Sequence, residues 1–474
     1  MTRGWTFRLP RELAGSLRSD LAESALLGRD QLPWPTEVSV EGDVVVVSRD
    51  QHEPMCVQTP LTLPDFGRVV VQSCALPENG EYDLLLELAR GETDKVRTEF
   101  AECERKGFRA SVALRQLHDH VCSRLAGAVF TRDSVRALDA VRAALWCGEL
   151  LNEEFGRQSA SHRKGRPDKP IRLGCVFDDR FFGVENPAAL RKLFDAVTIP
   201  VDWRSLELDT GERQWEMLEK RVDWCLDRGL AVTVGPILDL HALPGWLAGL
   251  DDSDSAQMLM IDLVETAVAR LQDRVTSWEV VAGANSSPLY GADHRALTLL
   301  VMKSLEAVHL QDPQARLSLT IDRPWGDYLP GGEVLAGPIE FIDRLVRMEA
   351  PIASLNLEIA IGVPGGSRRR PILDFRRLID RYSELGPALS VRLFRPAGTS
   401  EDPQLLGESG EDAQADWLEA HLLTALAAPS VEQVEWGRMH DFPNQRWPGC
   451  GLFSESGEPR RALRRLRAVR KACF

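Results

Sequence analysis

The sequence predicts an α/β protein with a C-terminal (β/α)8 TIM barrel, preceded by a smaller N-terminal region of strands and helices. Three observations lead to this prediction. The chain has 474 residues, which is more than one hydrophobic core ordinarily organises. Residues 1–90 contain β-branched runs separated by Gly, Pro and Asp. Residues 171–474 alternate short apolar runs with amphipathic helical stretches, as successive βα units do.

The N-terminal region divides into a strand-rich unit and a helical segment. Runs such as Val44–Val47 and Val69–Val71 favour a small antiparallel sheet within residues 1–90. From about Leu84, apolar residues recur at helical spacing, which predicts helices that fill residues 91–158. The next segment, 159–170, is polar, basic and interrupted by proline, so it is expected to be an exposed linker.

Eight apolar runs after the linker are the expected barrel strands. They are Ile171–Phe177, Ala196–Pro200, Ala231–Ile237, Ser277–Ala282, Arg316–Ile321, Ser354–Ile361, Ala388–Phe394 and Val431–Trp436. A doubly wound sheet is the alternative for such a series. It is disfavoured because no Gly-rich phosphate loop follows the first run.

Charge and composition limit the classes of partner. The chain has 57 Lys and Arg against 71 Asp and Glu, and the resulting net charge of -14 opposes binding to nucleic acid or to an anionic membrane. No apolar run is long enough to cross a bilayer and no signal peptide is visible, so a cytoplasmic location is expected. The nine cysteines are scattered and are expected to be reduced thiols. No metal-ligand spacing and no cofactor motif is present in the sequence.

Four segments of the barrel region resemble, in order and in register, the family 10 glycoside hydrolases, the xylanase family of retaining barrel enzymes. These segments are Val201–Glu207, His241–Leu247, Trp278–Val281 and Val434–Gly437. The resemblance implies a barrel whose active site lies at the carboxyl ends of the strands.

The resemblance also indicates where catalytic groups should lie. Retaining hydrolysis uses an acid/base and a nucleophilic carboxylate about 5–5.5 Å apart. In the family these glutamates end the fourth and seventh strands, and the matching positions here hold Gly283 and Arg392. Glycine has no group to donate a proton, and a guanidinium is not a nucleophile. Ordinary xylanase catalysis is therefore not expected.

Two other carboxylates are candidates for chemistry at the barrel mouth. Strand alternation turns Glu358 towards the face that the family uses for the sugar, and Asp202 occupies a mapped substrate position. The two could divide acid and base roles. The structural alternatives are that Glu358 is paired with Arg392 or Arg395, and that Asp202 caps a helix. Glu279 is expected to be a buried structural acid.

Substrate contacts are expected from residues that follow the strands. The candidates are Trp436, His241, Asp239, Arg392, Glu435 and Trp325. Indole rings can stack on pyranose rings, and histidine can titrate near neutral pH. The alternatives are loop packing for Trp325 and an ordinary hydrogen-bonded histidine for His241. The arginine run Arg368–Arg370 is expected on a solvated loop.

Three functions remain open from the sequence. The first is a carbohydrate-active protein that binds a poly- or oligosaccharide, with degenerate or non-family catalysis. The second is an inactive barrel that serves as a scaffold for a protein partner. The third is an active O-glycosyl hydrolase that uses a different carboxylate pair. Whether the protein is an enzyme stays open at this point.

Overall fold

The structure is a computed structural model of the chain. It describes residues 3–49, 53–77, 80–164, 171–183, 190–208, 211–249, 253–287, 294–331, 336–398, 410–442 and 446–473. All structural statements below concern these residues.

Two small sheets and one helix form the start of the chain. The strands are β1 (Arg3–Arg8), β2 (Ala25–Leu27), β3 (Glu37–Glu41), β4 (Val44–Arg49), β5 (Cys56–Leu63), β6 (Gly67–Gln72) and β7 (Glu81–Asp83), with α1 (Arg11–Leu21) between β1 and β2. One sheet has the order β3-β4-β1-β7 and the other β2-β5-β6. The hairpins β3–β4 and β5–β6 are antiparallel, as expected from their β-branched runs.

Three helices follow, namely α2 (Leu84–Arg105), α3 (Val112–Thr131) and α4 (Ser134–Lys164). Asp83 caps α2 by accepting a hydrogen bond from the Leu86 amide at 3.0 Å, and Ser111 caps α3 in the same way. The expected linker begins too early, because α4 continues through its first six residues. Ala160 is buried there, and Arg163 donates hydrogen bonds to three backbone carbonyls near Val431.

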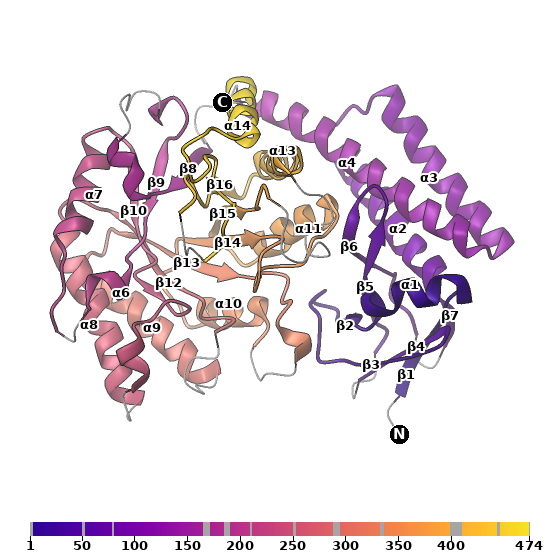
Figure 1. The fold of residues 1–474 in the computed structure, drawn as a ribbon, viewed down its shortest axis with the longest axis horizontal. Coiled ribbons are helices and arrows are strands. Elements are labelled where there is room, and N and C mark those ends of the chain that lie inside the picture. The colour runs from indigo at the N-terminus through magenta and orange to yellow at the C-terminus, as the bar shows by residue number, and fades with distance from the viewer. Residues whose placement is uncertain are drawn as a thin grey trace.

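The remaining strands form a closed parallel barrel. They are β8 (Arg172–Val176), β9 (Ala196–Ile199), β10 (Ala231–Val234) with β11 (Leu238–Asp239), β12 (Ser277–Ala282), β13 (Arg316–Asp322), β14 (Ser354–Ala360), β15 (Ala388–Phe394) and β16 (Val431–Trp436). β10 and β11 together form the third barrel strand. The order β10-β9-β8-β16-β15-β14-β13-β12-β11 is closed by the pairing of β10 with β12. The predicted TIM barrel is therefore confirmed (Figure 1).

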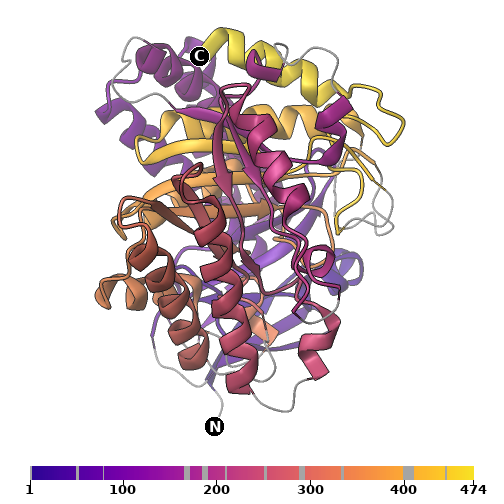
Figure 2. The same cartoon turned by 90° about the vertical axis from the view of Figure 1, so that its left-hand side faces the viewer.

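Helices cover the outside of the barrel. They are α6 (Trp203–Leu206), α7 (Glu216–Leu226), α8 (Ser253–Leu271), α9 (His294–Gln311), α10 (Pro338–Arg347), α11 (Ile372–Ser383), α13 (Glu411–Ala427) and α14 (Arg461–Cys473). α4 contacts α11, α13 and α14, and α14 lies beside the N-terminal helices in both views (Figures 1 and 2). None of the helices in the described ranges is long and apolar enough to span a bilayer.

The N-terminal helices share the core of the barrel. Side chains of α2 and α4, among them Phe100 and Phe155, belong to the same buried apolar cluster as the barrel strands. A second cluster, which includes Trp5 and Val47, lies between the N-terminal sheets and the first turns of α2. The helical segment therefore joins the strand-rich unit to the barrel by apolar packing on both sides.

The loop between β14 and α11 ties the barrel to the N-terminal strands. The Val70 amide donates a hydrogen bond to the Arg369 carbonyl at 2.9 Å, and the Arg369 side chain donates to the Phe66 carbonyl. Arg368 donates to the Glu23 carbonyl at 3.0 Å. The expectation of a solvated loop at Arg368–Arg370 is wrong, because these guanidinium groups satisfy acceptors contributed by other elements.

Candidate functional site

The carboxyl ends of β11, β12 and β13 bring a polar cluster to the barrel mouth. It consists of Asp239, His241, Ser286 and Asp322. Asp239 ends β11 and accepts a hydrogen bond from the His241 amide at 2.9 Å, which fixes the turn that carries the imidazole. Ser286 lies in the turn after β12 and Asp322 is the last residue of β13. The short turns after these parallel strands place all four residues on one side of the mouth.

Asp322 is the ionised acid of this cluster. His241 Nε2 lies 3.0 Å from Asp322 Oδ2, and Ser286 Oγ donates a hydrogen bond to the same oxygen. Burial alone would raise the pKa of the Asp322 carboxyl, but the bonds from His241 and Ser286 and the nearby charge of Arg323 hold it below its usual value. Asp322 Oδ1 is buried and has no hydrogen-bond partner among the described residues.

Glu358 faces this cluster from the neighbouring strand. It is the register partner of Asp322 across β13 and β14, so both side chains point into the barrel. Burial raises the pKa of Glu358 to about 7, with Asp322 adding to the rise and Arg446 opposing it. Within the described residues no group donates a hydrogen bond to this carboxyl. Asp322 and Glu358 are therefore adjacent acids with pKa values displaced in opposite directions.

Gly283 lies against the imidazole of His241. Its φ is +82°, and a Cβ at this position would lie 2.9 Å from His241 Cδ2 and 3.0 Å from His241 Nε2. A side chain at residue 283 would therefore collide with the ring in a backbone conformation that disfavours L-residues. The imidazole occupies the space that a longer side chain would need.

Arg392 is buried inside the barrel in an ion network. Its guanidinium contacts Glu279 at 2.5 Å and Glu435 at 2.9 Å. Burial lowers the pKa of Arg392, but the charges of the two glutamates reverse that effect and raise it, so the group stays charged. Thr198 and Gln433 donate further hydrogen bonds to Glu435. The expected structural role of Glu279 is confirmed, and Arg392 and Glu435 serve the same network instead of facing the mouth.

Of the two alternative partners expected for Glu358, Arg392 is excluded by this network. Arg392 is its register partner on β15, yet the Arg392 guanidinium bonds to Glu279 and Glu435. Arg392 therefore influences Glu358 only through its charge.

Asp202 follows β9 at the start of α6. It is exposed at the N-cap position of that helix and accepts a hydrogen bond from Ser205 Oγ at 2.6 Å. The acid beside Glu358 in the sheet is Asp322, and a division of acid and base roles between Glu358 and Asp202 stays a prediction.

The tryptophans expected at the substrate are buried. Trp436 is 2% exposed, donates from Nε1 to the Cys450 carbonyl at 2.9 Å, and packs edge-to-face on Trp417 of α13. It points outward because its neighbour Glu435 points inward. Trp325 is 6% exposed and lies under the guanidinium of Arg370, away from the polar cluster. Neither indole offers an open face at the mouth.

An apolar plug fills the side of the mouth formed by β14 to β16. It consists of Ala360, Val363, Phe394, Trp447 and Cys450. The Phe394 and Trp447 rings meet edge-to-face with centroids 4.7 Å apart. The space beside Glu358, bounded by Asp322, Arg446 and the glycines after β14, amounts to about 170 Å³ with open solvent included, and it encloses no water-sized cavity. Within the described residues, the mouth beside Glu358 is thus a narrow crevice and not a pocket that would hold an extended polymer.

The described residues hold no group of three or more His, Cys, Asp or Glu side chains arranged to hold a metal ion. The titratable and charged groups gathered around Glu358 at the mouth are the carboxyl of Asp322, the imidazole of His241 and the guanidinium of Arg446. Sequence reasoning missed Ser286 and Arg446. Only the position of Ser286, three residues after Gly283, gave a signal that it would lie near the mouth.

Comparison with solved structures places the barrel among xylanases in fold. Native xylanase 10B from Thermotoga maritima aligns with a TM-score of 0.50 at 17% identity, over 66% of this chain and 97% of that chain. Xylanase 10B from Thermotoga petrophila RKU-1, solved with xylobiose, aligns with a TM-score of 0.49 at 17% identity, over 66% of this chain and 96% of that chain. A psychrophilic family 10 endo-β-1,4-xylanase aligns with a TM-score of 0.49 at 18% identity, over 63% of this chain and 96% of that chain. No protein-family model and no curated protein matches the sequence.

Proposed function

We propose that this protein binds the end of a saccharide, or a single sugar unit, at the mouth of its xylanase-like barrel, and that it lacks the two-glutamate hydrolysis of xylanases. The similarity in fold to xylanase 10B supports a carbohydrate ligand, since active sites of this fold lie at the carboxyl ends of the strands. The residue types at Gly283 and Arg392 support the loss of xylanase chemistry.

The observation that carries the proposal is the state of Glu358. A carboxyl with a pKa of about 7 that receives no hydrogen bond from the described residues can both donate to and accept from a sugar hydroxyl near neutral pH. The ionised Asp322 beside it adds a second acceptor at the same hollow. Phe394 and Trp447 fill the adjoining side of the mouth, which favours a small unit or a chain end over a polymer as the ligand.

Glu358→Ala is expected to weaken saccharide binding by at least about tenfold, the loss that follows when one hydrogen bond to a charged or strongly polar partner is removed. Isothermal titration calorimetry of the full chain with xylose, xylobiose, glucose, cellobiose and galactose measures it. Glu306→Gln, an exposed change on α9, is the matched control and leaves binding unchanged.

Turnover assays separate binding from catalysis. The proposal expects no release of nitrophenol from aryl xylosides or glucosides by the wild-type protein. Turnover that disappears in Glu358→Gln would instead establish a hydrolase that uses Glu358 with Asp322, and the absence of any saccharide binding would contradict the proposal.

A protein-interaction scaffold is the second candidate, and the apolar plug is the observation that favours it. Phe394 and Trp447 fill the part of the mouth where a polymer would otherwise lie. A scaffold is expected to show no thermal shift with any saccharide and to bind a protein partner through its N-terminal region. Retention of that partner by Glu358→Ala would separate the two candidates.

A further inference from the structure

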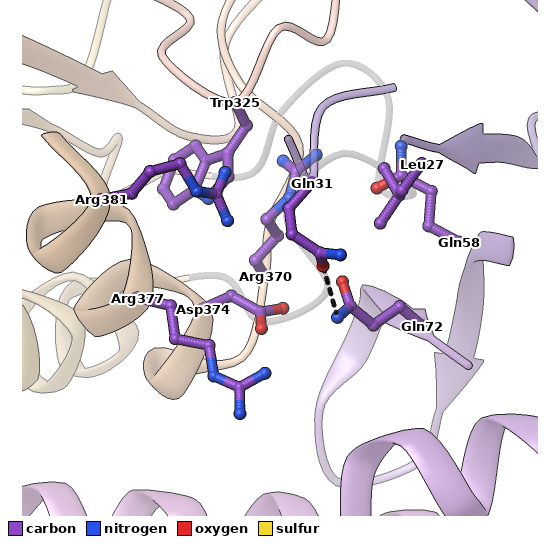
Figure 3. A pocket seen from close by; sticks show the side chains of 9 residues that line it. All are labelled: Leu27, Gln31, Gln58, Gln72, Trp325, Arg370, Asp374, Arg377 and Arg381. Atoms are coloured by element: carbon purple, nitrogen blue, oxygen red, sulfur yellow. Dashed lines mark hydrogen bonds between the residues drawn. The ribbon is translucent and has the colours of Figure 1, made fainter. Parts of the chain in front are cut away.

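A second polar hollow lies between the N-terminal strands and the barrel, outside the mouth. It has an empty volume of about 350 Å³, open solvent included. Figure 3 shows its two walls: three glutamines and Leu27 come from the N-terminal strands and loops, and three arginines, Asp374 and Trp325 come from the barrel. The lining residues are Leu27, Gln31, Gln58, Gln72, Trp325, Arg370, Asp374, Arg377 and Arg381.

The cationic wall is one face of α11. Arg370 precedes the helix, and Asp374, Arg377 and Arg381 follow at intervals of four, three and four residues. Within α11 this spacing places Asp374, Arg377 and Arg381 on a single face. Arg370, which lies just before the helix, lines the same wall together with them.

Two of these charges are already compensated within the structure. Arg370 forms a two-pronged ion pair with Asp327, at 2.7 and 3.0 Å, and its guanidinium lies 5.0 Å from the centre of the Trp325 ring. Arg377 donates to Glu99 at 3.0 Å.

The acid in this wall has a cationic partner as well. Asp374 accepts a hydrogen bond from the buried Lys95 ammonium at 2.7 Å, and that ammonium also contacts Glu92 at 2.8 Å. Asp374 therefore shares its cation with Glu92, and its charge also acts on Arg381 without forming an ion pair with it.

Arg381 is different from the other two arginines. It is mostly buried, and within the described residues its guanidinium has neither a hydrogen bond nor an ion pair. Burial lowers the pKa of this guanidinium, while Tyr382 and the charges of Asp30 and Asp374 oppose that effect. A charged guanidinium that is mostly removed from water and has no ionic partner raises the free energy of the folded state, and binding of an anion lowers it again.

The opposite wall offers neutral polar groups. Gln72 Nε2 donates to Gln31 Oε1 at 3.3 Å, and Gln58 lines the hollow beside them. Side-chain amides both donate and accept hydrogen bonds, so they can bind the hydroxyls or ester oxygens that accompany an anionic group.

We propose that this hollow is a binding site for an oxyanion, the phosphate or carboxylate group of a small polar molecule, with Arg381 as its principal ligand. The planar guanidinium fork matches two oxygens of such a group. The amide groups of the glutamine wall contact the rest of the molecule. A neutral sugar lacks the charge that would compensate Arg381, so it is not the expected ligand.

Calorimetric titration of the full chain in a buffer free of phosphate and carboxylates tests the proposal. The probes are inorganic phosphate, glucose 6-phosphate, glucuronate and, as the neutral comparison, glucose. At least one anion is expected to bind, and glucose is not expected to bind at this hollow. If inorganic phosphate binds most tightly, the site is one for free phosphate. If glucose 6-phosphate binds most tightly, the ligand is a phosphorylated sugar, and if glucuronate does, the ligand is a sugar acid.

Variants identify the residue responsible. Arg381→Gln is expected to lower the affinity for the anion at least about tenfold. Arg381→Lys is expected to lower it less, because lysine keeps the positive charge but lacks the planar guanidinium that binds two oxygens. Arg347→Gln on α10, exposed and paired only within its helix, is the matched control with unchanged affinity. Because Glu358 lies at the mouth, Glu358→Ala leaves this site unchanged, which keeps it distinct from the saccharide site.

Stability in anion-free buffer gives a second measurement. Arg381→Gln is expected to keep or raise the thermal midpoint, since no ion pair within the described residues is lost. A clear fall in the midpoint would show that Arg381 has a structural role and would overturn the proposal. So would the absence of binding heat for all three anions, or equal affinities in wild type and Arg381→Gln.

Discussion

Arg392→Met is expected to lower the free energy of unfolding by about 3–5 kcal/mol, because it leaves Glu279 and Glu435 buried without their shared cation. Both carboxylates are less than 3% exposed, and each bonds directly to the guanidinium. Urea denaturation at pH 7 measures the change. Arg347→Met, which removes an exposed arginine of α10, is the control and is expected to leave the free energy of unfolding nearly unchanged.

A compensated variant tests the cause of this loss. Adding Glu279→Gln and Glu435→Gln to Arg392→Met removes the stranded charges and is expected to recover most of the stability. A loss of similar size in the triple variant would point to packing of the Arg392 side chain instead of charge.

The same geometry predicts that xylanase activity cannot be restored by returning glutamates to Gly283 and Arg392. A glutamate at residue 283 meets the His241 ring and a positive φ, and one at residue 392 brings a third carboxylate to Glu279 and Glu435.

Raising the pH from 4.5 to 8 is expected to destabilise the wild-type protein by up to about 3 kcal/mol more than Glu358→Gln, at roughly 1.36 kcal/mol per pKa unit. The pKa of Glu358 is about 7 in the fold, above its ordinary value of 4.5 in the unfolded chain. Between these two values the folded state holds a proton that the unfolded state has released. Stability is therefore fully present below pH 4.5 and is lost as the pH rises through 7.

The measurement is the free energy of unfolding of both proteins at pH 4.5, 6 and 8. The amide of Glu358→Gln is neutral throughout, so subtracting its profile removes the contributions of the other titrating groups. A difference that stays constant with pH would mean that Glu358 is charged in the fold, and would also remove the main support for saccharide binding by a protonated carboxyl.

Much of the barrel could be predicted from local pattern. The predicted runs Ser277–Ala282, Ala388–Phe394 and Val431–Trp436 coincide with β12, β15 and β16. Buried parallel strands read as short apolar runs with clear ends, which is why their limits are visible in the sequence. The third strand was predicted as one run and is divided at Gly235, whose Cβ would lie 2.0 Å from the Glu279 carbonyl oxygen.

The site was less predictable, because it depends on contacts between distant strands. Alternation correctly turned Glu358 inward, and the same rule shows that Glu435 and Trp436 cannot both face the mouth. The Arg392 network joins three strands across the barrel, and its partners follow only from closure of the sheet. The Asp202 turn could be placed at the mouth, but its distance from Glu358 could not be read from the sequence.

The loop between β14 and α11 forms part of both hollows. Gly365–Ser367 borders the mouth beside Glu358, and Arg370, three residues later, lines the cationic hollow. The Arg369 carbonyl between them accepts a hydrogen bond from the Val70 amide of β6, so the segment that joins the two hollows is anchored to the N-terminal strands. By the reciprocity of linked equilibria, any effect of a mouth ligand on the affinity for an anion must be matched by an equal effect of the anion on the mouth.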